Sequence, residues 1–170
     1  MGITPAPPYD PFAEPAPAAG TGHPTAAWGD RVGAAFIDFF VRLAIFAVCM
    51  IAGAAGYLAG GSAGEIGITA GIVLGVILTW FVYAPLMMAR TDGQTVGHRA
   101  TNTRVVMADG SRMSGAKAFV REALVKGILI ETVGSFTLYI LPLVNYLFPL
   151  WDPNKETLHD KLTGTRVVAA

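Results

Sequence analysis

The sequence predicts an all-α integral membrane helical bundle with a small cytoplasmic β-hairpin or sheet. Two observations of composition indicate a membrane protein: 53% of the 170 residues are hydrophobic and only 14% are charged, whereas soluble domains carry about 25% charged residues. The third observation is a pattern, because two apolar stretches each exceed the roughly 20 residues that cross a bilayer. We therefore expect the lipid bilayer to be a partner of this chain.

The composition also narrows the function. Twelve basic and twelve acidic side chains leave no net charge, which argues against a nucleic-acid partner. A single cysteine, Cys49, excludes an internal disulfide framework or a cysteine-based zinc site. The sequence contains no phosphate loop, no metal-binding histidine spacing and no nucleophile with a base at a readable spacing. We therefore predict no enzymatic activity, no cofactor and no metal.

Residues 1–27 form a proline-rich tail that contains seven of the eleven prolines. Such a segment lacks apolar periodicity and cannot bury enough surface to offset the entropy of ordering. We expect an extended, polyproline-like segment, which is either an inert linker or an arm that docks onto a protein partner. The membrane domain then occupies residues 28–170.

The two spans have different residue patterns. The first covers about residues 32–58, a glycine-rich break follows, and the second, at about 66–89, carries no charge. The second span has small residues at four-residue spacing, which let another helix approach closely: Gly67, Gly71 and Gly75. We expect these glycines to pack against the first span; the alternative is a contact with another subunit, which leaves a homo-oligomer open.

A polar loop at 90–117 follows the spans, with five basic residues against two acidic ones and hence a net charge of +3. By the positive-inside rule this loop is cytoplasmic, and so is the N-terminus two spans earlier. Alternating residues around Asp109 and Gly110 predict a β-hairpin inside the loop. Ser114 is a candidate N-cap for the helix that comes next.

Residues 118–151 are longer than one membrane crossing requires and shorter than two crossings of about 20 residues each. Their first half carries four charges, and the middle and the end are interrupted by Gly134-Ser135, Pro142 and Pro149. We predict a broken helical hairpin that enters the membrane or its interface and returns to the side it left.

The string TRVV occurs at residues 103–106 and again at residues 165–168. Both copies have the character of short β-strands, and we expect them to pair in one small sheet. Pairing would place the C-terminal segment, residues 152–170, in the cytoplasm as well.

Three charges lie in or beside the first span: Arg31, Asp38 and Arg42. Arg31 and Asp38 are nearly two helical turns apart, and Asp38 precedes Arg42 by four residues, the favourable order for a helical ion pair. An ionisable group at membrane depth is costly unless it is paired or hydrated, so we expect Asp38 to pair with one of the arginines. Asp38 is then either the centre of a polar network that fixes helix packing or a site for a cation or proton.

These residues resemble the RDD family of bacterial membrane proteins, which is named for one arginine and two aspartates. Arg31, Asp38 and Asp160 match the three named residues, and the closing LHDKLTGTRVV is very close to the family ending. The loop TVGHRATNTRVV at 95–106 is similar to the family loop after the second span. Three of its residues depart from the family pattern, which has Pro, Lys and Gly there: Val96, His98 and Asn102.

The resemblance implies a multi-span protein of the bacterial cytoplasmic membrane. Some family members are similar to sodium(proton) antiporters, and others with proline-rich tails look like accessory components of larger assemblies. Physically, an Arg31–Asp160 pair would fasten the C-terminal segment against the first helix, and Asp38 would extend this network inward.

Of the two roles, we favour an accessory or scaffolding subunit of a larger membrane complex. The tail and the glycine faces would contact its protein partners, and a respiratory complex is one candidate host by analogy. The alternative is a small cation/proton antiporter, or another secondary transporter, that uses Asp38.

Overall fold

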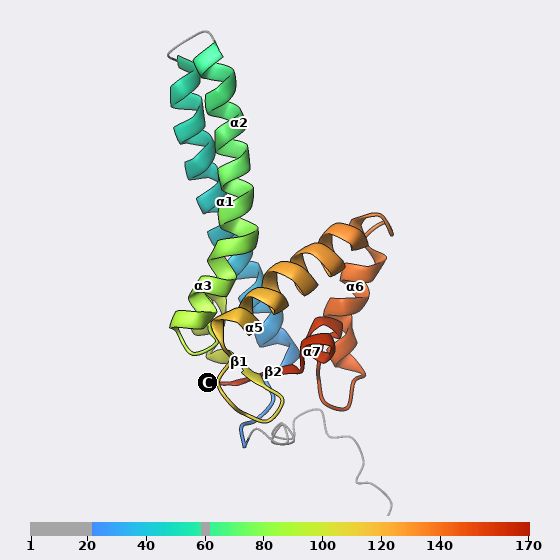
Figure 1. The fold of residues 1–170 in the computed structure, drawn as a ribbon. Coiled ribbons are helices and arrows are strands. Elements are labelled where there is room, and N and C mark those ends of the chain that lie inside the picture. The colour runs from blue at the N-terminus through green and yellow to red at the C-terminus, as the bar shows by residue number, and fades with distance from the viewer. Residues whose placement is uncertain (1–21, 59–61) are drawn as a thin grey trace, which may run out of the picture.

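The computed structural model describes residues 22–58 and 62–170, so most of the proline-rich tail and the glycines at positions 60 and 61 lie outside the described residues. Two helical arms rise from a common base and diverge from each other (Figure 1). The first arm is a pair of long helices, the second is a shorter hairpin, and a two-stranded sheet lies at the base.

The first arm contains the two predicted spans. Helix α1 (Trp28–Leu58) is followed by one continuous helical rod, built from α2 (Ser62–Val76), the π-helical η1 (Ile77–Val82) and α3 (Tyr83–Arg90). Two helices of the described chain are long and apolar enough to cross a membrane, α1 with 31 residues and Gly64–Arg90 with 27. The expected positions of the spans are therefore confirmed as helices.

The small residues of the second span pack against α1, as expected. A Cβ atom added to Gly71 would lie 2.7 Å from the carbonyl oxygen of Cys49, and one added to Gly53 would lie 2.5 Å from that of Gly67. Gly75 likewise faces α1. The helix backbones are in direct contact here, because a side chain larger than hydrogen would hold them apart.

The π-helical turns of η1 have a local cause in the sequence. Pro85 follows them within α3 and has no amide hydrogen to donate to the carbonyl four residues earlier. Upstream, the hydroxyl of Thr79 donates to the carbonyl oxygen of Gly75 at 2.7 Å. Wide π turns are one way in which a helix accommodates such a break.

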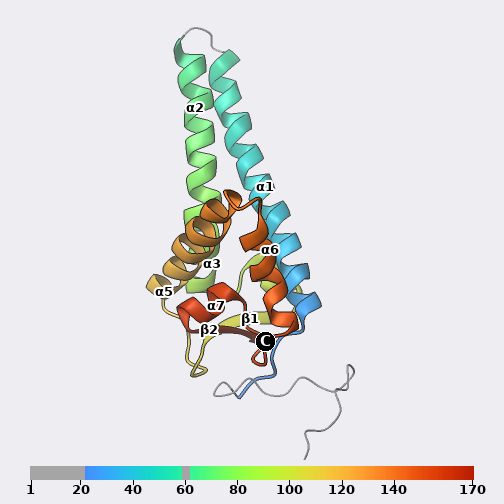
Figure 2. The same cartoon turned by 90° about the vertical axis from the view of Figure 1, so that its right-hand side faces the viewer.

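The second arm is the broken helical hairpin predicted for residues 118–151. It consists of α5 (Gly115–Phe119), the π-helical η2 (Val120–Val133), α6 (Ile140–Leu147) and the short 3-10 helix η3 (Phe148–Leu150). The hairpin turns at its tip and brings the chain back to the base (Figure 2). Nothing in the sequence of η2 explains its π winding.

The turn of this hairpin is compact because small and rigid residues meet there. A Cβ atom on Gly134 would lie 2.6 Å from the Cδ of Pro142. Leu138 and Tyr139 have positive φ angles of 51° and 61°, a left-handed conformation that reverses the chain. The predicted N-cap of α5 is also confirmed, since the Ser114 hydroxyl accepts a hydrogen bond from the amide of Lys117.

The repeated TRVV strings pair with each other, as predicted. Strand β1 (Thr103–Met107) runs antiparallel to β2 (Thr165–Ala169), with Val105 opposite Val167. On the other edge of β2, the amide of Ala26 donates to the carbonyl oxygen of Val167 at 3.2 Å, so the segment before α1 also joins the sheet.

The predicted β-hairpin around Asp109 and Gly110 is wrong in its second strand. The turn itself forms, with the Gly110 amide donating to the Met107 carbonyl at 2.9 Å. After it, however, Met113 is buried and Ser114 already caps α5, so the chain enters a helix. Strand β1 therefore pairs with β2.

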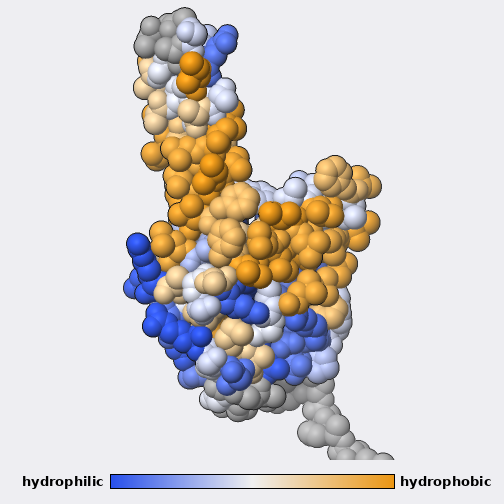
Figure 3. Space-filling view, viewed as in Figure 1, coloured by the Kyte–Doolittle hydropathy of each residue, from blue (hydrophilic) through white to orange (hydrophobic). Residues whose placement is uncertain are grey.

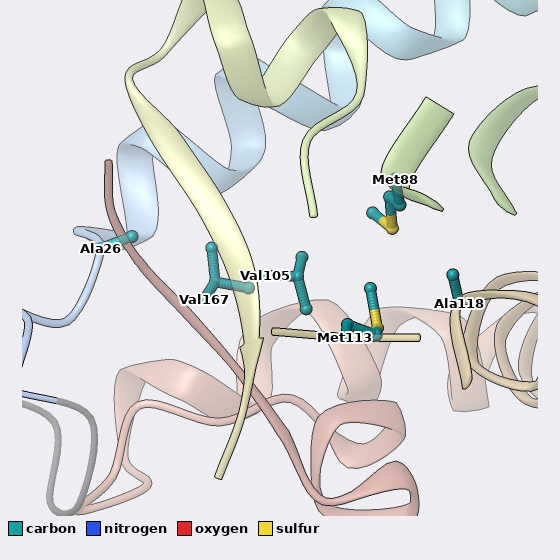
Figure 4. Packing of buried hydrophobic residues seen from close by; sticks show 6 residues of the cluster. All are labelled: Ala26, Met88, Val105, Met113, Ala118 and Val167. Carbon is teal, nitrogen blue, oxygen red and sulfur yellow. The ribbon is translucent and has the colours of Figure 1, made fainter. Parts of the chain in front are cut away.

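A small apolar core joins the sheet to the base of both arms (Figure 4). It combines side chains from the segment before α1, from α3, from both strands and from the start of the second arm: Ala26, Met88, Val105, Met113, Ala118 and Val167. The surface differs between the arms and the base. Hydrophobic side chains cover much of both arms, and hydrophilic ones gather at the base (Figure 3).

Candidate functional site

Asp38 lies on α1 where the helix passes the base, and its carboxylate is almost fully enclosed. It accepts three hydrogen bonds: from the hydroxyl of Tyr83 at 2.7 Å, from that of Thr95 at 2.6 Å and from the amide of Gly97 at 2.8 Å. Tyr83 comes from α3, and the other two belong to α4 (Val96–Ala100) and its N-cap. One carboxylate thus fastens α3 and the following loop to α1.

Gly97 makes this contact sterically feasible. A Cβ atom at this position would lie 2.0 Å from the carbonyl oxygen of Ala34 and 2.9 Å from the Cγ of Asp38. The glycine of the family-like loop therefore lets α4 approach the α1 backbone closely enough to hydrogen-bond Asp38.

The expectation that Asp38 pairs with Arg31 or Arg42 is wrong. Its carboxylate is satisfied by two hydroxyls and one amide, which fit a crowded helix crossing better than a long arginine side chain. Arg42 instead points toward the second arm, where its Nη2 lies 3.9 Å from Glu122. Arg31 points toward the C-terminal segment.

Asp160 is the centre of a second cluster and is fully buried. Its carboxylate accepts a hydrogen bond from Arg121 at 2.6 Å, from the Thr165 hydroxyl at 3.3 Å and from the Thr157 amide at 3.2 Å. The Nη1 of Arg31 lies 3.5 Å from the same carboxylate. The predicted contact between Arg31 and Asp160 is therefore present, and it joins α1, η2 and the C-terminal segment.

The electrostatics of this cluster favour a charged Asp160. Burial alone would raise the pKa of its carboxyl, but the positive charges of Arg121 and Arg31 and the hydrogen bond from Arg121 together outweigh burial, and the pKa lies well below its usual value. Arg31 also donates to the carbonyl oxygen of Val167 at 3.1 Å. The arginine thus holds both the carboxylate of this segment and the backbone of β2.

A short helix, α7 (Leu158–Thr163), presents Asp160 to the arginines. A capping box starts the helix, in which the Thr157 hydroxyl and the Asp160 carboxylate bond each other's backbone amides. His159 packs beside them and its amide donates to the side-chain oxygen of Asn145 in α6 at 3.1 Å. Burial lowers the pKa of His159 to about 3, so the imidazole is neutral at pH 7.

Glu122 extends the network up the second arm. It forms an ion pair with Arg121 and lies 3.7 Å from the Nζ of Lys126 and 3.9 Å from the Nη2 of Arg42. Sequence reasoning counted these charges of 118–151 but assigned them to the membrane interface, and so missed Arg121 as a partner of Asp160 and Glu122 as a partner of Arg42 on the first helix. The sequence did contain a signal for these buried ion pairs, because four charges lie within an otherwise apolar stretch.

Two adjoining hollows lie between α1 and the second arm. The inner one, of about 50 Å³, touches Asp160 and Arg121, and the outer one, of about 150 Å³, touches Arg42 and Glu131. Both include Asp38 in their walls. The inner hollow has room for a few water molecules. Within residues 22–58 and 62–170, no three His, Cys, Asp or Glu side chains are placed to hold a metal ion.

Comparison with known protein families agrees with the geometry of this base. The family model described as RDD family matches residues 25–164, which is most of the chain and includes Arg31, Asp38 and Asp160. The chain belongs to the RDD family. No curated protein and no solved structure matches it. In this RDD protein, Arg31 and Asp160 share one cluster, whereas Asp38 is the centre of another.

Proposed function

We propose that this RDD protein is a non-catalytic accessory subunit of a larger bacterial membrane complex. In this proposal, α1 and the helix Gly64–Arg90 cross the inner membrane, and the second arm enters it from the cytoplasmic side and returns. The sheet, the N-terminal segment and the C-terminal segment lie in the cytoplasm. The net charge of +3 in the loop at 90–117 supports this orientation.

The observation that carries the proposal is that the buried carboxylates hold the helices and the C-terminal segment together. Asp38 holds α3 and α4 against α1, and Asp160 holds α7 and η2 together with Arg31. A carboxylate that accepts several short hydrogen bonds fixes the relative positions of the elements that donate them. Such groups build a rigid platform, which fits a scaffolding role better than repeated binding and release of an ion.

The surfaces left for protein partners also fit this role. The glycine face of the second span is occupied by α1, so the proposed contact with the host complex falls on the tail and on the outer apolar faces of the arms. A respiratory complex remains a candidate host by family analogy alone.

An affinity purification from the native membrane tests this role. The tagged full-length chain is extracted in mild detergent, and the mass and composition of the recovered particle are measured. We expect a large complex in constant stoichiometry, lost when residues 1–20 are deleted. This deletion keeps the bonds of residues 24–26 to β2, so folding is preserved. Recovery of a monomer or a small homo-oligomer would contradict the proposal.

A second candidate function is cation/proton exchange, and the hollows favour it. They connect Asp38 with Glu131, which forms no ion pair in the described part of the chain and accepts one hydrogen bond, from Tyr146 at 3.3 Å. In vesicles that contain only the purified chain, exchange that disappears in Asp38→Asn and Glu131→Gln would establish this function. Absence of exchange in the wild-type chain leaves the accessory role as the better account.

A further inference from the structure

The outer hollow is continuous with a wider one in the angle between the two arms. The two share Phe39, Arg42 and Glu131 in their walls. The wider hollow, of about 310 Å³, is otherwise mostly apolar, with Leu43 and Trp80 among its lining residues. The combined groove therefore has a polar end near the base and an apolar end higher between the arms.

Two cationic side chains at the polar end have donors without acceptors. The Nε of Arg42 is buried and has no hydrogen-bond partner. The Nη2 of Arg42 and the Nζ of Lys126 lie 3.9 Å and 3.7 Å from Glu122, both longer than a hydrogen bond. Because the unsatisfied buried donor of Arg42 is costly, and the ammonium of Lys126 lines the same hollow, this arrangement calls for an oxyanion between the two cations.

Charge counting adds a second requirement for the occupant. The charged residues that line the outer hollow sum to zero, so a zwitterion matches it: Arg42, Lys126, Asp38 and Glu131. The carboxylate of Asp38 is already held by three hydrogen bonds, and a singly charged phosphate diester would pair with the two cations. Glu131 lies in the walls of both hollows and carries a negative charge that is not ion-paired in the described chain. A cation that donates hydrogen bonds would neutralise it. The groove thus has separate places for a phosphate and for an amine.

We propose that this groove binds a phospholipid whose headgroup joins a phosphate to a primary amine, as in phosphatidylethanolamine. The phosphate lies between Arg42 and Lys126, and the ammonium donates to Glu131. An acyl chain occupies the apolar end, beside Leu43 and Trp80. The inference rests on the membrane placement proposed above, because only a protein within the bilayer has lipid at this groove.

Native mass spectrometry of the full-length, delipidated chain tests the site. Phosphatidylethanolamine, phosphatidylcholine and phosphatidylglycerol are added separately to the protein in mild detergent, and inorganic phosphate is added as a lipid-free probe. We expect phosphatidylethanolamine to be retained best. Phosphatidylcholine has no N–H donors on its amine, phosphatidylglycerol has no amine, and inorganic phosphate has no acyl chain to make the apolar contacts.

Three variants locate the contacts. Arg42→Gln and Lys126→Gln should each weaken retention about tenfold, or about 1.4 kcal/mol, because each removes a charge-assisted contact to the phosphate. Glu131→Gln should abolish the preference for phosphatidylethanolamine over phosphatidylglycerol. Arg90→Gln and Glu65→Gln are matched controls, because both side chains are exposed and outside the hollows. Neither control should change retention.

Equal retention of the three lipids, or variants that bind like the controls, would overturn the proposal. Thermal unfolding of each variant without added lipid separates loss of the site from loss of the fold. Resistance of the wild-type chain to alkaline extraction from phosphatidylcholine vesicles reports membrane insertion on its own. A chain that inserts but shows no lipid preference therefore refutes the lipid site alone, and a chain that is extracted refutes the membrane placement.

Discussion

Replacing Gly97 by alanine should separate the loop helix α4 from α1. The added Cβ atom would lie 2.0 Å from the carbonyl oxygen of Ala34, a backbone atom that no side-chain rotation can remove. Helix α4 must therefore shift, and the hydrogen bonds that Gly97 and Thr95 donate to Asp38 must lengthen or break.

The size of the effect follows from these two bonds. Each is made to a charged group and contributes about 1.5–3 kcal/mol, so weakening both costs about 3–6 kcal/mol. Alanine gains up to about 1 kcal/mol over glycine from helix propensity. The net loss of about 2–5 kcal/mol corresponds to a decrease of roughly 10 °C in Tm for a chain of this size.

The assay is thermal unfolding of the detergent-solubilised protein, followed by circular dichroism. Gly33→Ala is the matched control on the facing surface of α1, since its new Cβ atom would lie 3.4 Å from the Cγ2 of Thr101, an ordinary contact. We expect the Tm of Gly33→Ala to equal or exceed that of the wild type. If Gly97→Ala unfolds at the same temperature as Gly33→Ala, the assigned role of Asp38 is refuted.

Three further predictions concern the ion pairs and the first arm. Asp160→Asn removes one of the two carboxylates that pair with the buried Arg121 and the carboxylate partner of Arg31, and should cost about 3–5 kcal/mol. Asp109→Asn, at an exposed turn, should leave Tm unchanged. Burial lowers the folded-state pKa of His159 from 6.5 to about 3. The contribution of this histidine to the free energy of unfolding is therefore complete above pH 6.5 and falls toward pH 3, by up to about 1.4 kcal/mol per pH unit. A Tm that stays constant between pH 7 and pH 4.5 would contradict this. Gly71→Ala places a Cβ atom 2.7 Å from an α1 carbonyl and should lower Tm through a loss of about 1–3 kcal/mol, and wild-type stability in this variant would show that the helix pair tolerates wider spacing.

The parts of the fold that follow from local pattern were predictable. The spans follow from apolar length, the packing of Gly67 and Gly71 follows from their spacing, and the cap at Ser114 follows from the short polar side chain before a helix. The pairing of β1 with β2 was also predictable, because the chain repeats the same four residues.

The partners of the buried charges were harder to predict from the sequence. The helical spacing of Asp38 and Arg42 suggested an ion pair within one helix, but the tertiary structure supplies Tyr83 and Thr95 as donors. These polar side chains come from α3 and from the N-cap of α4, and only the folded chain shows that they converge. The same reason hid Glu122, whose partner Arg42 lies on the other arm.

The distance along the chain between Arg31 and its partners sets an order of assembly. Its bond to the Val167 carbonyl spans 136 positions, and Asp160 is nearly as far away. Ribosomes deliver the N-terminal residues first, so α1 emerges with Arg31 long before its carboxylate partner, and η2 emerges with Arg121 paired only to the adjacent Glu122. The C-terminal segment acts as a latch, because its arrival gives Arg31 its carboxylate and Arg121 a second one. A chain interrupted before Asp160 would leave Arg31 without its carboxylate partner and the base of the two arms unfastened.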